Sequence, residues 1–213
     1  MIDVERSQPA PASLARRVDG CWRAKEVRGR LRTDFLGKCY LCEVPLDGFE
    51  VDHRVPKGAE GSVSWEAHAF DWDDLFPACH DCNNGRPEPR PGGLLSPGDG
   101  VEARLAQAYL DDEPVFEAVD RADAAAANLA HELSHLHGRP NPAAADLRDN
   151  IRRTISKVLE LQNDVYEAML RDPKDAQEIA RLKGRLRVAV SRGAAFTMLV
   201  RSKVKPRFHE LFD

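Results

Sequence analysis

The sequence predicts an α+β protein that is mostly α, with a small cysteine-rich core between two helical regions. Stretches near both ends of the chain repeat apolar residues at the helical period. Strand and turn chemistry is concentrated in a short stretch between them, which two C-x-x-C pairs bracket. We therefore expect a tail and basic helix in residues 1–38, the core in 39–95 and a helical region in 96–213.

The first segment is expected to be a disordered start followed by one helix. "PAPAS" ends the disordered part, and Ser13 can act as the N-cap of a helix that runs to about Phe35. Gly37 has the backbone freedom that ends such a helix. The apolar residues that define it are Leu14, Val18, Trp22, Val27, Leu31 and Phe35.

The core segment is expected to contain short elements. Residues 39–56 combine a cysteine turn with a hairpin, because "VPLDG" has turn chemistry and "FEV" has strand chemistry. A loop then runs from Lys57 to about Asp71, and a short helix opens at Cys79. "RPEPRPGGLLSPGDG" (86–100) is dense in proline and glycine, which predicts an irregular boundary.

The last segment is expected to be nearly all helix. Apolar residues follow steps of three, four and seven from Leu147 to Leu170, and a second helix after Pro173 repeats the design. These apolar stripes consist of Ile151, Ile155, Val158, Val165 and Met169 in the first helix, and of Ile179, Leu182, Leu186 and Val190 in the second.

Charge is distributed unevenly along the chain, whose formal net charge is −4. Residues 16–38 hold eight Lys/Arg against three Asp/Glu, and residues 148–209 hold fifteen against seven. The intervening residues 39–147 hold seven against twenty-one. The basic flanks are candidate nucleic-acid surfaces and the acidic middle suits a cation, although solvated helices would show the same charges.

The chain has neither a membrane-span pattern nor a signal-peptide pattern. No stretch approaches the roughly 18 consecutive apolar residues of a membrane span. The N-terminal "MIDVERSQPAPAS" lacks the basic start and apolar core of a signal peptide. We expect a soluble cytoplasmic protein that does not contact a membrane.

Four of the five cysteines form two pairs, Cys39 with Cys42 and Cys79 with Cys82, separated by 36 residues. In a reducing compartment this pattern predicts a metal site rather than disulfides. Four thiolates suit tetrahedral Zn²⁺, and each two-residue spacer lets a turn aim both sulfurs at one ion. Such a closed site predicts structural zinc, so any chemistry must come from the insert between the pairs. Cys21 is then an ordinary helix-face thiol.

The insert and the residues after it contain the parts of a metal-dependent phosphodiesterase. Such an enzyme needs a base that deprotonates water, a hard cation on the phosphate and positive charge on the flanking backbone. His53 is the candidate base, while Asp52 and Asn83 offer oxygen ligands to Mg²⁺ or Mn²⁺. The candidate phosphate contacts are Arg54, Lys57 and Arg86.

Residues 39–86 resemble the ββα-metal HNH endonucleases in their zinc-stapled form. The likeness is carried by "CYLCE", "VDHRVPKG" and "WDDLFPACHDCNNGR". The family pattern runs C-x-x-C, D-H-x-x-P-K, W-x-N-L and C-x-x-C-[HN]-x-x-K. The basic helix before this core, "GGLLSP" after it and "RRTISKVLELQNDV" are similar to the HNH subunit of Septu-type and retron-associated anti-phage systems, which works beside an ATPase.

The resemblance implies a role for each matching position. His53 would be the general base, and Asp52 and Asn83 would bind the catalytic Mg²⁺ or Mn²⁺. Asp74 stands where the motif has the asparagine that braces the base. An aspartate can hold a histidine by accepting a hydrogen bond, but it adds negative charge beside a phosphate. Arg86 stands in place of the family's last lysine, a change that phosphate contact tolerates.

A rival motif occurs in "HELSHLHG" (131–138), which contains H-E-x-x-H on a predicted helix. His131 and His135 would share one face with Glu132 beside them, as in a zinc metalloprotease. The pattern fails at the third ligand position, which is Asn141, because a catalytic zinc needs three protein ligands. Histidines near a helix C-terminus explain the motif without a metal, and an adventitious or regulatory metal site is the other alternative.

The sequence therefore predicts a metal-dependent endonuclease that hydrolyses phosphodiester bonds in nucleic acid, which we expect to be DNA. We expect it to be the nuclease component of an anti-phage defence system with a partner ATPase. Because the core is acidic, the basic flanks or the partner would hold the nucleic acid. Two alternatives stay open: a zinc-stapled nucleic-acid or protein binding module whose catalysis has lapsed, and the zinc metalloprotease.

Overall fold

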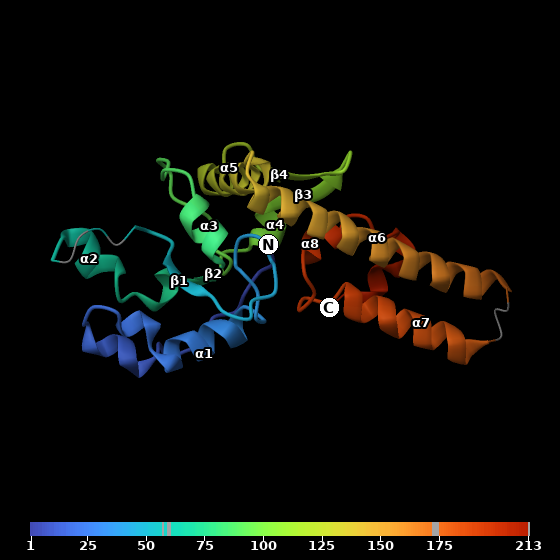
Figure 1. Cartoon of the computed structure of the whole chain (residues 1–213), viewed down its shortest axis with the longest axis horizontal. Coiled ribbons are helices and arrows are strands. Elements are labelled where there is room, and N and C mark those ends of the chain that lie inside the picture. The colour runs from blue at the N-terminus through green and yellow to red at the C-terminus, as the bar shows by residue number, and fades with distance from the viewer. Residues whose placement is uncertain (57, 59–60, 172–174, 213) are drawn as a thin grey trace.

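A computed structural model describes residues 1–56, 58, 61–171 and 175–212. These residues form a mostly helical α+β protein with two separate antiparallel sheets of two strands each (Figure 1). The first sheet belongs to the cysteine-rich core and the second follows it along the chain. None of the described helices combines the length and the apolar character that a membrane crossing requires.

The N-terminal residues lie in the core, so the predicted disordered start is wrong. The side chains of Met1, Ile2 and Val4 are buried. The backbone N–H of Val4 donates to the carbonyl of Pro97 at 2.8 Å. Local composition is typical of a disordered tail here, but contacts with residues far along the chain order it.

The single helix predicted from Ser13 to Phe35 is broken into three pieces. The 3-10 helices η1 (Ala12–Arg16) and η2 (Cys21–Arg23) precede α1 (Lys25–Asp34). The break before α1 falls at Ala24, whose ψ angle of 147° is not helical. The break between η1 and η2 contains Arg17 and Gly20, whose φ angles of 48° and 75° are left-handed. A right-handed helix cannot contain that conformation, which glycine adopts at little cost.

The core sheet consists of β1 (Glu50–His53) and β2 (Leu75–Ala78). Its register places His53 opposite Leu75. The hairpin predicted within residues 39–56 is therefore wrong, because "FEV" pairs with a strand on the far side of the insert. Sheet pairing depends on which strands meet in space, which residue chemistry alone does not specify.

Short helices complete the core. α2 (Val63–His68) lies within the insert, where a loop was predicted, and the 3-10 helix η3 (Trp72–Asp74) follows that predicted loop. Cys79 opens α3 (His80–Gly85) as its N-cap, in agreement with the prediction, and the Cys79 sulfur accepts a hydrogen bond from the N–H of Cys82 at 3.4 Å. Residues 86–100 contain neither helix nor strand, in agreement with their proline and glycine content.

The second sheet corrects the prediction that residues 96–213 are nearly all helix. After the short helix α4 (Val101–Arg104), β3 (Leu105–Leu110) and β4 (Glu113–Ala118) form a hairpin. Asp111 and Asp112 connect the strands with φ angles of 47° and 63°, the geometry of a two-residue primed turn. The sequence signal is weak because glycine is the usual second residue of such a turn.

Helices occupy the remainder of the described chain. α5 (Ala124–Gly138) packs on β4, and α6 (Pro142–Arg171) and α7 (Ala176–Ala189) extend side by side away from the core (Figure 1). The helix α8 (Thr197–Arg201) and the 3-10 helix η4 (Pro206–Leu211) end the fold. The predicted apolar stripes of α6 and α7 are confirmed, because Ile151, Ile155, Val158, Val165, Leu182, Leu186 and Val190 are buried. The exceptions are Met169, with 37% of its surface exposed, and Ile179, which is half-buried.

The side chain of His137, near the end of α5, is buried beside the ring of Phe116, with 5.1 Å between ring centroids. Burial lowers the pKa of His137 to about 4, and the positive charges of the N-terminal ammonium and Arg148 act in the same direction. The folded-state pKa is therefore below the unfolded value of about 6.5. As the pH falls, the unfolded state binds this proton first, and folding loses stability.

We expect the free energy of unfolding to fall by about 3 kcal/mol between pH 7 and pH 4 on account of His137. The substitution His137→Leu should remove this part of the pH dependence, because leucine fills a similar volume and does not titrate. Urea unfolding of both proteins across this range measures it. Loss of any bound metal in acid affects both proteins alike. The difference between their free energies of unfolding therefore reports the contribution of His137. Parallel pH curves would contradict the assignment.

Candidate functional site

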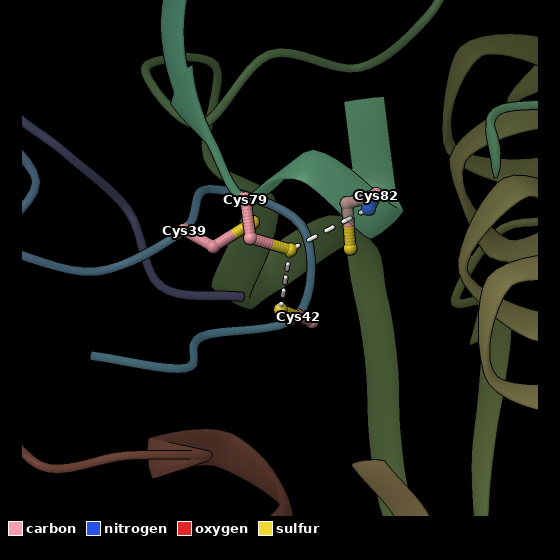
Figure 2. Close-up of side chains that lie close together, drawn as sticks. All are labelled: Cys39, Cys42, Cys79 and Cys82. Carbon is pink, nitrogen blue, oxygen red and sulfur yellow. Dashed lines mark hydrogen bonds between the residues drawn. The ribbon is translucent and has the colours of Figure 1, made fainter. Parts of the chain in front are cut away.

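Four cysteine sulfurs converge beside the core sheet. Cys39 and Cys42 come from one loop, and Cys79 and Cys82 come from the start of α3 (Figure 2). The four sulfurs lie within 4.8 Å of one another, and those of Cys42 and Cys79 are 3.8 Å apart. Tetrahedral zinc with bonds of about 2.3 Å places its sulfur ligands about 3.8 Å apart. The predicted cluster is confirmed, and its geometry is consistent with structural Zn²⁺.

The four thiols do not ionise alike. Hydrogen bonds within the cluster, first of all with Cys39, lower the pKa of the Cys79 thiol and raise the pKa values of the Cys42 and Cys82 thiols. Four thiolates this close together repel one another. Full deprotonation of the cluster therefore requires a cation, which is the behaviour of a metal site.

An open cleft of about 770 Å³ lies beside β1. It gathers Asp52, His53, Asn83 and Arg86, four residues that the sequence singled out. The structure therefore brings together the candidate base and both candidate cation ligands. Lys57, another candidate phosphate contact, is outside the described residues.

Asp52 is held by two donors that use the same carboxylate oxygen. The hydroxyl of Tyr40 donates to Oδ2 at 2.6 Å, and Nη1 of Arg86 donates to it at 2.8 Å. Burial and the charge of Asp52 raise the pKa of Tyr40 well above its usual range, so this hydroxyl keeps its proton and donates. Neither contact uses Oδ1, which is the oxygen available to a cation.

Asn83 is oriented by Glu50, a residue that the sequence reasoning missed. Nδ2 of Asn83 donates to Oε2 of Glu50 at 2.6 Å, which makes the amide oxygen the atom available to a cation. Glu50 and Asp52 are two positions apart on β1, so their side chains lie on the same face. The E-x-D-H spacing could have indicated Glu50.

His80 pairs with the other oxygen of Glu50 through Nδ1 at 2.8 Å. The hydrogen bond with His80 lowers the pKa of Glu50, and the same contact raises the pKa of His80. The His80 side chain is exposed. It lies behind Glu50 and completes a row of contacts that holds Asn83.

The arrangement of oxygens fits a hard divalent cation. Asp52 offers a carboxylate oxygen and Asn83 an amide oxygen in the same cleft, and each side chain is held through its other polar atom. Mg²⁺ in proteins is commonly held by one or two such ligands, with water and phosphate at the remaining positions. Partners that orient the ligands are typical of metal sites.

His53 is held by the backbone and by an aromatic ring. Its Nε2 lies 3.2 Å from the carbonyl oxygen of Ala69. Because a carbonyl only accepts, Nε2 carries the proton of the neutral ring and Nδ1 is the basic nitrogen. The ring of Trp22 packs edge-on against the imidazole, with 4.9 Å between ring centroids. Together these contacts define the tautomer and the orientation of the ring.

Both carboxylate oxygens of Asp74 have partners other than the base that it was expected to brace. Oδ2 pairs with Nδ1 of His68, and Oδ1 lies 3.5 Å from Nη2 of Arg54. The sequence suggested neither contact, because His68 belongs to a helix that was not predicted. Among the described residues, the hydrogen bond at Nε2 of His53 is made with the carbonyl of Ala69 and not with Asp74.

The two predicted phosphate contacts that the structure describes are engaged within the protein. Arg54 donates to the carbonyl of Leu94 at 2.7 Å in addition to its pair with Asp74. Arg86 donates from all three of its nitrogens to acceptors of the protein. The geometry therefore does not favour a phosphate role for either arginine. Arg86 satisfies carboxylate and carbonyl oxygens at the end of β1, whereas Arg54 satisfies oxygens of Asp74 and Leu94.

Other basic residues line the cleft. Arg23 of η2 and Arg28 of α1 form part of its wall, and the Arg28 guanidinium lies over the ring of Phe49 at 4.7 Å. Both belong to the N-terminal segment, whose positive charge was recognised in the sequence. These arginines therefore replace Arg54 and Arg86 as candidate phosphate contacts.

The H-E-x-x-H motif lies on α5, but its glutamate is used elsewhere. Glu132 is buried and pairs with Nε of Arg86 at 2.7 Å. The rings of His131 and His135 are 6.5 Å apart. Within the part of the chain that the structure describes, the four cysteines are the one group of three or more His, Cys, Asp or Glu residues close enough to share an ion. The metalloprotease alternative thus has no ligand set there.

Comparison with known proteins does not assign the chain to a family. No protein-family model matches it, and neither a curated protein nor a solved structure shows significant similarity. The geometry itself establishes a mostly helical α+β protein with a four-cysteine cluster that is consistent with structural Zn²⁺.

Proposed function

We propose that this protein is a metal-dependent endonuclease of the HNH type, which hydrolyses phosphodiester bonds in nucleic acid, with DNA as the expected substrate. The observation that carries the proposal is the convergence of His53, Asp52 and Asn83 in one cleft, each held by a second residue. The order β1, β2, α3, with the last cysteine pair at the start of α3, supports the resemblance to zinc-stapled HNH enzymes.

In the proposed reaction, Nδ1 of His53 takes a proton from the water that attacks phosphorus. Nε2 keeps its hydrogen bond to the Ala69 carbonyl, which also stabilises the imidazolium as it forms. Asp52 and Asn83 would hold Mg²⁺ or Mn²⁺, which supplies stabilisation of the charge on the phosphate and on the leaving 3′ oxygen. Glu50 and Tyr40 keep the two ligands in place.

Nucleic acid would approach along the N-terminal segment. Arg23 and Arg28 place positive charge on the wall of the cleft, while Glu50 and Asp52 make its floor acidic. A phosphate backbone is attracted to the first pair and needs a cation to approach the second. The proposal includes a partner ATPase and a role in anti-phage defence, which the resemblance alone supports.

We expect the purified protein to cleave plasmid DNA with Mg²⁺ or Mn²⁺ and not with EDTA. The substitution Asp52→Asn should lower the cleavage rate by about 100-fold, because the amide keeps the shape of the ligand and loses its charge. Agarose gels that follow supercoiled, nicked and linear plasmid measure the rate. Single-stranded DNA and RNA in parallel reactions define the substrate.

Asp164→Asn is the matched control, because Asp164 is exposed on α6 and outside the cleft. Its rate should equal that of the unchanged protein. If no substrate is cleaved, alone or with an ATPase encoded beside it, the binding-module alternative replaces the nuclease proposal.

A further inference from the structure

A buried row of charged groups runs from the cleft to α5. Nη1 of Arg86 lies 2.8 Å from Oδ2 of Asp52, and Nε of the same guanidinium lies 2.7 Å from Oε1 of Glu132. The exposed fractions of the three side chains are 8% for Asp52, 15% for Arg86 and 7% for Glu132. One guanidinium is thus shared by two carboxylates that are far apart in the sequence.

The position of Arg86 is fixed on several sides. Besides the two carboxylates, Nη1 contacts the carbonyl of His53 at 3.3 Å and Nη2 donates to the carbonyl of Arg54 at 3.0 Å. The guanidinium is a rigid planar fork, so it cannot turn toward one acceptor without leaving another. Whatever holds Arg86 therefore also holds the end of β1, where Asp52 and His53 lie.

Glu132 changes the charge that Asp52 presents to the cleft. Asp52 and Arg86 alone would form a neutral pair, and the full positive charge of Arg86 would oppose a divalent cation at Asp52. With Glu132 the group carries two negative charges and one positive charge. Arg86 is then neutralised from behind, and the net charge that the group presents to a cation is negative.

The pKa directions agree with this arrangement. Burial opposes the charge of Arg86, but the neighbouring oxygens of Tyr40, Asp52 and Glu132 raise its pKa overall. Burial raises the pKa of Glu132, and the ion pair with Arg86 offsets this only in part. The surroundings thus favour the charged form of Arg86 and disfavour the charged form of Glu132. This is expected where one cation lies between two carboxylates.

We propose that Glu132 is a positioning residue of the cation site, which acts through Arg86 to keep Asp52 oriented and the net charge of the group negative. The inference rests on the proposed function, because it requires that Asp52 binds a divalent cation. It gives the H-E-x-x-H glutamate a role unrelated to proteolysis. It also makes the placement of α5 a condition for cation binding at β1.

Binding of Mn²⁺ to the full chain, with its cysteine cluster loaded with zinc and without nucleic acid, tests this role. Electron paramagnetic resonance of free Mn²⁺ gives the Kd directly. Glu132→Gln should raise the Kd for Mn²⁺ at the site that requires Asp52 by about 10-fold. Loss of a partner that orients a metal ligand weakens binding by about 10- to 100-fold. Arg86→Lys should raise it similarly, because a lysine ammonium cannot bridge both carboxylates.

Glu178→Gln is the matched control. Glu178 also pairs with an arginine, Arg181, through two contacts of 2.7 Å, but it lies on α7 away from the cleft. Its Kd should equal that of the unchanged protein. Zinc content and thermal unfolding, measured on each variant, identify any protein that has not folded.

The outcomes separate this inference from the proposed function. If the unchanged protein and Asp52→Asn bind Mn²⁺ alike, both proposals fall. If Asp52 is required for binding but folded Glu132→Gln stays within twofold of the unchanged protein, only the role of Glu132 is overturned. Should Glu132→Gln fail to fold, a folded Arg86→Lys protein with unchanged Kd overturns that role instead.

Discussion

Replacement of Cys79 by serine is expected to abolish zinc binding and to unfold the core. Structural zinc in small domains contributes apparent binding free energies of about 10–16 kcal/mol, which are also free energies of folding. The core sheet has only two strands, and such a sheet is marginal without support. We therefore expect the unchanged protein to hold about one zinc ion per chain and the variant to hold none.

The serine substitution separates the role of Cys79 as a zinc ligand from its role as a helix cap. This residue caps α3 by accepting a hydrogen bond from Cys82, and serine is also a good N-cap. Loss of the fold would thus follow from loss of the metal. Zinc analysis, circular dichroism and limited proteolysis measure the effect. Cys21→Ser is the matched control, because Cys21 is a buried thiol outside the cluster, and it should keep its zinc.

The zinc cluster is also connected to the cleft. Tyr40 lies between the first two cysteines, and its hydroxyl holds Oδ2 of Asp52. Removal of zinc should therefore displace Asp52 even where helices persist. A chain that stays folded without zinc would refute the structural role of the cluster.

The sequence predicted those parts of the fold that follow from local patterns. The C-x-x-C spacing identified the four converging sulfurs, and apolar periodicity identified α6 and α7 because a helix buries one face through residues three and four apart. The pairing of β1 with β2 is a contact between distant segments. Residue chemistry marked β1 as a strand but contained no information about its partner.

Within the site as well, local patterns could be predicted and contacts between distant segments could not. Asp52, His53 and Asn83 were identified from their types and spacing, and the structure places them in one cleft. Of the partners that orient them, Glu50 could have been found from its spacing on β1, but Ala69 could not, because it contributes only a backbone carbonyl. Glu132 reaches the site from a helix whose motif suggested other chemistry.

Arginine roles were the least predictable feature. A guanidinium binds phosphate and carboxylate with the same geometry, so the sequence cannot distinguish the two uses. Arg54 and Arg86 lie next to buried Asp74 and Asp52, and these carboxylates engage them. Arg23 and Arg28, which line the cleft wall, have no ion-pair partner among the described residues and remain available to a phosphate.

The change His53→Ala is expected to lower the rate of DNA cleavage by about 100- to 10,000-fold, the usual contribution of a general base. Alanine removes the nitrogen that accepts the proton and leaves Asp52 and Asn83 in place, so Mn²⁺ binding should persist. A single-turnover assay with saturating DNA measures the chemical step. His135→Ala is the matched control, because His135 is exposed on α5 and does not line the cleft.

Rescue by added imidazole would distinguish loss of the base from loss of structure. The space that the ring vacates lies between the ring of Trp22 and the carbonyl of Ala69, so a free imidazole can bind there in the orientation that presents a basic nitrogen. We expect partial recovery of the rate in His53→Ala and none in Asp52→Asn, whose defect lies in the cation ligand. Cleavage by His53→Ala at the unchanged rate would remove His53 from the mechanism and the nuclease proposal with it.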